Sequence, residues 1–325
     1  MKLFTSSLLL ACLAFAGCTT MKDQYTSFMG GEDNTIPPTP LPDITERVSI
    51  TRLWKTSAGG GYEEQYLKLI PIPGDDRIFA ADSEGEIRAI DRQTGRTIWD
   101  VDTDAPITGG PGTGSNLVVV GTGKGEVIAI SADSGEILWR SRVTSEVLAA
   151  PRIAGNIVVV RTIDGKIFGF NVADGNRLWI YERPVPALTL RGTSSPVIAD
   201  DFVIAGFDEG RLAAIELQTG KLVWETRVAL GSGRSELERM VDIDSEPVVV
   251  DDVIYVATFQ GRIAAIAIES GRILWTRDIS SYAGLCADQS NVYVTDDNSA
   301  IWALDRATGN RVGAEVQGNH QRLHV

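Results

Sequence analysis

Two glycines ten residues apart, followed four residues later by a tryptophan, recur along this chain of 325 residues. The five complete copies enclose runs of alternating apolar residues, of which EIRAID at residues 86–91 is the clearest. Alternation with a period of two predicts a strand, and glycine permits the positive φ angles that tight turns often require. The repeat therefore constrains the chain to a series of small antiparallel sheets.

Each repeat is long enough for four strands. A β-rich run precedes each first glycine, as at residues 117–120 and 157–160, and an earlier strand begins at Pro111, Pro151, Pro196 or Pro247. Successive tryptophans are 40 to 51 residues apart, from Trp99 to Trp139 and from Trp224 to Trp275 respectively. This spacing indicates an all-β propeller of four-stranded blades, with about six blades represented.

The recurring tryptophan is predicted to anchor each blade to the next, because one indole buries about 200 Å² of mostly apolar surface. The segment 50–56 has the pattern of a tryptophan-bearing last strand with no blade before it, as expected where a propeller closes. In the sixth repeat, Gly313 stands where the tryptophan is expected. The predicted anchors are Trp54, Trp99, Trp139, Trp179, Trp224 and Trp275.

The N-terminus has the pattern of an exported lipoprotein. Residues 1–17 read as a signal peptide, and Ala16-Gly17-Cys18 reads as a lipobox, so Cys18 is the predicted lipidation site. A signal peptide cut at another position is the alternative. Residues 18–45 are proline-containing and predict a flexible tether, and Thr19 in place of aspartate indicates the outer membrane.

The predicted propeller covers residues 46–312 and is followed by a tail, residues 313–325, without alternating apolar positions. We expect this aberrant tail to reflect a frameshift or premature stop. The alternative is a complete propeller of six or seven blades that the Trp54 segment closes.

Composition argues against several functions. A net charge of −13 would repel phosphate backbones, so nucleic-acid binding is not expected.

Cys286 is expected to be a small buried residue and not a nucleophile, since the two histidines of the chain offer it no credible base. Recurrent aspartates such as Asp91 and Asp305 read as turn residues. The glycine-rich stretch 109–114 lacks a phosphate-loop ending and reads as a loop. No catalytic residue, metal site or cofactor is predicted.

The lipobox, the tether and the motif A-x-D-x-x-T-G-x-x-x-W at residues 89–99 together resemble the BamB family. These are propeller lipoproteins of the outer-membrane β-barrel assembly (BAM) machinery. The repeat itself is shared with quinoprotein dehydrogenases. The resemblance, which covers residues 1 to about 312, implies a PQQ-like (WD40-like) propeller with eight blades in the family.

Two further segments carry this resemblance, PALTLRG at 186–192 and MVDIDSEP at 240–247. The resemblance implies that they grip BamA, the barrel-inserting component. Both segments lie in connectors between a tryptophan strand and the next proline-led strand, so we expect them on one face of the propeller. In the alternative interpretation, the arginine pairs with an aspartate inside the protein and the leucines pack beneath the loop. The implied contact residues are Leu188, Leu190, Arg191, Asp242 and Asp244.

The predicted function is therefore a non-enzymatic scaffold that faces the periplasm from the outer membrane. Its expected partners are BamA, other BAM components and unfolded outer-membrane proteins. One alternative is a PQQ-dependent dehydrogenase, although the chain is short for that class and lacks an adjacent cysteine pair. Another is a cell-envelope scaffold unrelated to barrel assembly.

Overall fold

The computed structural model describes residues 49–61, 67–184, 194–231, 234, 240–312 and the backbone of 316–317. These residues all belong to one compact unit, 44–318. Their regular elements are strands, which form six four-stranded antiparallel sheets and confirm the predicted all-β fold. Within these ranges, no helix is long and apolar enough to cross a membrane.

The first three sheets have the same order of strands as the chain. The first contains β1 (Ile72–Pro73), β2 (Arg77–Ala81), β3 (Glu86–Asp91) and β4 (Thr97–Asp102). The second contains β5 (Ile107–Gly114), β6 (Leu117–Thr122), β7 (Glu126–Ser131) and β8 (Ile137–Arg142). The third contains β9 (Arg152–Ala154), β10 (Ile157–Arg161), β11 (Lys166–Asn171) and β12 (Arg177–Glu182).

The remaining three sheets repeat this topology. The fourth contains β13 (Val197–Ala199), β14 (Phe202–Phe207), β15 (Arg211–Glu216) and β16 (Leu222–Arg227). The fifth contains β17 (Val248–Val250), β18 (Val253–Ala257), β19 (Ile263–Ala267) and β20 (Ile273–Arg277). The sixth contains β21 (Leu285–Ala287), β22 (Asn291–Thr295), β23 (Ala300–Asp305) and β24 (Val316–Gln317).

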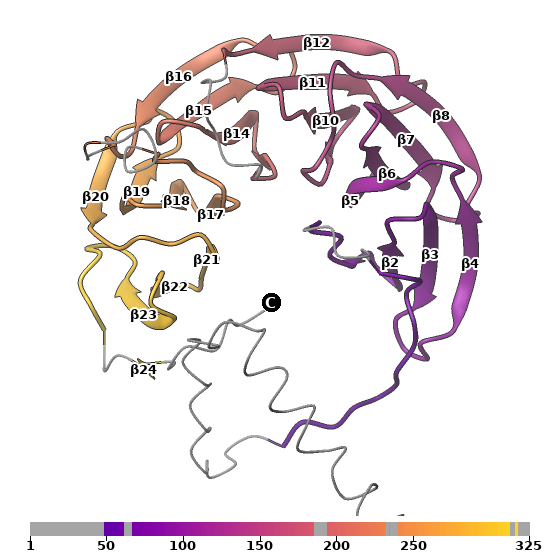
Figure 1. Cartoon of the computed structure of the whole chain (residues 1–325), viewed down its shortest axis with the longest axis horizontal. Coiled ribbons are helices and arrows are strands. Elements are labelled where there is room, and N and C mark those ends of the chain that lie inside the picture. The colour runs from indigo at the N-terminus through magenta and orange to yellow at the C-terminus, as the bar shows by residue number, and fades with distance from the viewer. Residues whose placement is uncertain are drawn as a thin grey trace, which may run out of the picture. The chain divides into compact units, whose positions relative to one another are not determined.

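The sheets follow one another around an arc in chain order, with strands such as β5, β17 and β21 inside and β4, β8, β12, β16 and β20 outside (Figure 1). The first strands of consecutive sheets contact one another, from β1 with β5 through to β17 with β21. As a result, connectors that are far apart in the sequence meet near the inner strands.

The hydrophobic core is divided into layers between neighbouring sheets. Five clusters of buried residues each join two consecutive sheets, and in the described residues none joins the sixth sheet to the first. The cluster between the first two sheets, for example, packs Phe79 and Ile87 against Val118 and Ile128. Each sheet is therefore stabilised mainly by its neighbours in the sequence.

Each of the six recurring tryptophans reaches the next sheet. The indole N–H donates to a turn carbonyl there at 2.7–3.0 Å, as in Trp179 Nε1 to the Leu217 oxygen at 2.9 Å. The ring lies against the second glycine of that repeat, and a Cβ atom on this glycine would approach it to 2.5–2.9 Å. All six of these glycines also have φ between +67° and +77°, so the turn and the packing both require glycine.

The segment around Trp54 behaves differently from the others. Trp54 contacts Gly95 and donates to the Arg92 carbonyl at 3.0 Å, as the other tryptophans do in their repeats. However, residues 50–56 form no strand, and the side chains of Ile50 and Leu53 are 88% and 79% exposed. Trp54 therefore packs on the first sheet, although its own segment belongs to no sheet in the described residues.

Besides the strand expected over residues 50–56, two sequence-based expectations were wrong in detail, and one predicted boundary falls inside a sheet. Residues 109–114 are part of β5 and not a loop, since glycine lets β5 approach the next sheet: a Cβ atom at Gly112 would lie 2.0 Å from the Pro151 carbonyl oxygen. Cys286 is exposed, because it alternates with the more buried Leu285 and Ala287 on β21. The boundary at residue 312 falls inside the sixth sheet, because β24 pairs with β23 at residues 316–317.

The tryptophan–glycine contact can be tested with two glycine-to-alanine variants. Both Gly220 and Gly155 have positive φ, +71° and +56°, but only Gly220 has a ring against it, whereas nothing lies within 4 Å of a Cβ at Gly155. We expect Gly155→Ala to lower the free energy of unfolding by about 1 kcal/mol from backbone strain alone. Gly220→Ala should cost roughly 2 kcal/mol more through overpacking. Equal losses in urea unfolding would contradict the proposed role of the ring.

Candidate functional site

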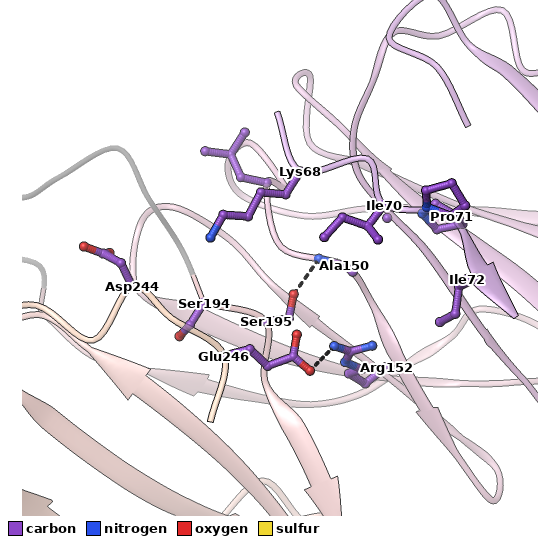
Figure 2. Close-up of a pocket in the computed structure, with 13 residues that line it drawn as sticks. Lys68, Ile70, Pro71, Ile72, Ala150, Arg152, Ser194, Ser195, Asp244 and Glu246 are labelled. Atoms are coloured by element: carbon purple, nitrogen blue, oxygen red, sulfur yellow. Dashed lines mark hydrogen bonds and ion pairs between the residues drawn. The ribbon is translucent and has the colours of Figure 1, made fainter. Parts of the chain in front are cut away.

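The connectors that lead into the inner strands surround a pocket of about 250 Å³ (Figure 2). Five consecutive sheets contribute to its wall, so it depends on the circular arrangement of the sheets. The wall includes Lys68 and Ile70–Ile72 from the first sheet, Pro111 from the second, Leu148 and Arg152 from the third, Ser194 and Ser195 from the fourth, and Asp244 and Glu246 from the fifth.

Hydrogen bonds between connectors hold this wall together. The Ser195 hydroxyl accepts from the Ala150 N–H at 3.0 Å. Arg152 donates from Nε to the Pro196 carbonyl at 3.1 Å, and its guanidinium also forms an ion pair with Glu246 (Figure 2). The third, fourth and fifth sheets are therefore tied to one another at the pocket.

Arg161, the last residue of β10, lies beside this wall and is only 5% exposed. It donates to the carbonyl and the hydroxyl of Ser194, both at 3.0 Å, and its guanidinium carbon lies 4.9 Å from the centre of the Phe207 ring. Burial lowers the pKa of Arg161 to about 10, against the opposing effect of nearby carboxylates such as Asp208. At neutral pH it therefore remains a buried cation.

Asp242 is a buried carboxylate, 4% exposed. Its Oδ1 accepts from the Glu209 N–H at 3.1 Å, and its carbonyl accepts from the Phe259 N–H at 3.1 Å. These bonds join the connector before β17 to turns of the fourth and fifth sheets. The position of Asp242 indicates that it shapes the connector.

Asp244 lines the pocket, and no hydrogen bond or ion pair to its carboxylate is found in the described residues. Burial, followed by the charge of Asp242, raises its pKa to about 7, whereas Arg161 and Lys68 act in the opposite direction. A partly buried carboxylate with no described partner on a pocket wall is a feature typical of functional sites.

The predicted contact residues divide into two groups. Asp242 and Asp244 lie close enough to Arg161 for their charges to raise the pKa of its guanidinium. Leu188, Leu190 and Arg191 lie outside the described residues, as does Cys18. The described chain resumes at Ser194, which is bonded to Arg161.

Sequence reasoning missed Arg161, although the repeats contain a signal. Counting along the β-rich runs, the corresponding positions are Ala81, Gly121, Gly206, Ala257 and Thr295, none of them charged. A single arginine at a position that is otherwise uncharged indicates a local role outside the common scaffold.

The recurrent aspartates have the predicted turn chemistry. Asp91 Oδ1 accepts hydrogen bonds from the Thr94 N–H at 2.6 Å and from the Thr94 hydroxyl at 2.7 Å. The bond from the hydroxyl is the largest cause of the lowered pKa of Asp91. Asp305 makes the same two bonds to Thr308, at 2.8 and 2.7 Å. In the part of the chain that the structure describes, no three His, Cys, Asp or Glu side chains are grouped as metal ligands.

Comparison with known proteins places this architecture in a family. The family model described as "Outer membrane protein assembly factor BamB" matches residues 83–314. The chain belongs to the BamB family. The BamB proteins of Pseudomonas aeruginosa and Legionella pneumophila are 51% and 46% identical to it, over 92% and 93% of this chain and 76% and 78% of theirs. The family expected from the sequence is therefore confirmed.

Solved structures agree with this assignment. The crystal structure of BamB from Moraxella catarrhalis aligns with a TM-score of 0.71 and 31% identity, over 76% of this chain and 75% of that chain. A quinohemoprotein alcohol dehydrogenase from Pseudomonas putida aligns with a TM-score of 0.56 and 14% identity, over 72% of this chain and 51% of that one. The second likeness shows a common propeller fold and nothing more.

The raised pKa of Asp244 leads to a prediction about stability. The folded protein binds the Asp244 proton more tightly than the unfolded chain, whose aspartates titrate near 3.8, so this residue lowers stability as the pH rises from about 4 to 7. Asp208 and Asp242 favour this shift, and Arg161 and Lys68 oppose it. We expect Asp244→Asn to be more stable than the wild type by roughly 1–4 kcal/mol at pH 8, with the difference vanishing below about pH 4.

Urea unfolding at several pH values measures this difference. Asp174→Asn is the matched control, since Asp174 lies in an exposed turn. A gain for Asp244→Asn that is independent of pH, or no gain at pH 8, would contradict the prediction.

Proposed function

We propose that this chain is a non-enzymatic scaffold of the outer-membrane β-barrel assembly machinery, and that it binds BamA through the two connectors before β13 and β17. The observation that supports this proposal is the meeting of both connectors at Arg161. This buried cation holds Ser194 at the end of the first connector and lies among carboxylates of the second.

The local geometry suggests different roles for the predicted contact residues. Asp242 is buried and hydrogen-bonded to a neighbouring turn, so it serves to position the second connector. Leu188, Leu190 and Arg191 lie three to six residues before Ser194 in the sequence and serve as the direct contacts. Aliphatic anchors beside an arginine have the composition of a binding hot spot with a polar rim.

The N-terminal features give this scaffold its location. Lipidated Cys18 would hold the chain at the periplasmic leaflet of the outer membrane, facing the periplasm. The tether of residues 18–45, if extended, would span about 80 Å, and would allow the propeller to reach periplasmic domains of its partner. Relatives of this chain are named as assembly factors, in keeping with a scaffold that performs no catalysis.

Copurification of BamA tests the docking proposal. Arg191→Ala and Leu190→Ala should each reduce the BamA recovered with the chain at least about tenfold, because hot-spot truncations typically cost 2 kcal/mol or more. Arg142→Ala on the outer strand β8 is the matched control and should leave recovery unchanged. If BamA is recovered equally with the wild type, Arg191→Ala and Leu190→Ala, the connectors are not the docking site.

Metabolic labelling with palmitate tests the anchor. The wild type should incorporate the label and fractionate with outer membranes, whereas Cys18→Ala should do neither, because it lacks the thiol that receives the lipid. Cys286→Ala provides a control for the remaining thiol of the propeller. Labelling that persists in Cys18→Ala would show that the lipid is attached elsewhere.

A further inference from the structure

The first sheet holds a segment of the chain, residues 54–61, that belongs to no sheet in the described residues. We call this segment the strap. At one end, Trp54 makes its contact with the turn between β3 and β4. At the other end, the Gly61 carbonyl accepts hydrogen bonds from the N–H and the hydroxyl of Ser83, at 2.9 and 3.1 Å, in the turn between β2 and β3. The strap is therefore attached to the turns at both ends of β3.

Asp82, the residue after β2, is the centre of the second attachment point and is only 1% exposed. Its Oδ1 accepts hydrogen bonds from the N–H groups of residues 84–86, at 2.9–3.1 Å. Its Oδ2 accepts a hydrogen bond from the Gly60 N–H of the strap at 3.0 Å. The two oxygens thus have separate tasks, since one closes the turn and the other holds the strap.

The other repeats show that closing the turn does not require a carboxylate. Three residues before the first glycine, where the first repeat has Asp82, the second, third and fifth repeats have the buried residues Thr122, Thr162 and Thr258. Thr122 Oγ1 and Thr258 Oγ1 accept hydrogen bonds from the N–H four residues later, at 3.0 and 2.7 Å. A threonine side chain has a single oxygen. The second carboxylate oxygen of Asp82 is therefore an addition to the common turn.

The strap meets Asp82 closely but has little else to hold it. Gly59 has a φ of +108°, and a Cβ atom there would lie 2.4 Å from Asp82 Oδ2, so this approach requires glycine. Between the two attachment points residues 55–58 are exposed, and Arg88 donates to the Ser57 carbonyl at a long distance of 3.4 Å. A segment with few buried contacts opens at a lower free energy than the sheet that carries it.

We propose that the strap opens and closes on the first sheet as a unit, and that Asp82 is the latch that holds it closed. While the strap is closed, the free chain between the anchor and the propeller ends before Trp54. Opening adds the eight residues 54–61 to that free chain, which lengthens it by up to about 28 Å at roughly 3.5 Å per extended residue. The latch thereby sets how far the propeller reaches from the membrane, a consequence that rests on the proposed anchor at Cys18.

Hydrogen exchange of the full chain, followed by mass spectrometry, tests the latch. Asp82→Thr keeps an oxygen that closes the turn and loses the one that binds Gly60. We expect amide exchange in residues 54–61 to become about tenfold faster, the effect of losing one hydrogen bond to a charged group, while β3 remains as protected as in the wild type. Gly59→Ala should accelerate exchange at least as much, because its Cβ atom would displace the strap from Asp82. Trypsin cleavage after Lys55 should accelerate in parallel.

Ser57→Ala is the matched control. Ser57 lies in the strap, its side chain is exposed, and in the described contacts only its carbonyl takes part, so exchange should be unchanged. Wild-type exchange of the strap in Asp82→Thr would overturn the proposal, as would equal acceleration in the strap and in β3. Strap amides that exchange as slowly as β3 in the wild type would also overturn it. Since exchange does not depend on the lipid, this outcome is separate from that of the palmitate experiment, which tests the anchor.

Discussion

The contact between an indole ring and a glycine of the next sheet is the interaction on which the rest of this structure depends. It occurs six times, and each time the indole N–H also donates to a neighbouring turn carbonyl. The ring can reach this position only where the neighbouring residue has no Cβ atom. The contact therefore sets both the distance and the rotation between successive sheets, and the arc of sheets follows from repeating it.

The candidate site at the pocket is a consequence of that arc. The inner strands converge, and the connectors of the third, fourth and fifth sheets are joined through Arg152, Ser195 and Arg161. This convergence places charges close together, including Asp244, whose carboxylate is partly buried at an energetic cost. Retaining a destabilising carboxylate on a pocket wall is consistent with a role in binding, because an optimally stable scaffold would have no need of it.

Particular residues show how far the sequence could be interpreted. The glycine–tryptophan spacing was sufficient to predict four-stranded sheets, since both turn geometry and strand alternation are local properties. The same local reasoning failed at Gly112, which lies in a strand that passes close to Pro151 of the next sheet. It also failed at Cys286, whose exposure depends on which face of β21 is covered. In both cases the deciding neighbour is distant in the sequence.

The sequence by itself determined the repeat, the blade architecture, the family and the residues that anchor one sheet to the next. Only the tertiary structure decided that Asp242 is buried, that Asp244 lacks a partner in the described residues, and that Arg161 lies between the two connectors. The physical reason is that strand and turn formation depend on neighbours along the chain. Burial and pairing of charges depend instead on which loops the circular packing of sheets brings together.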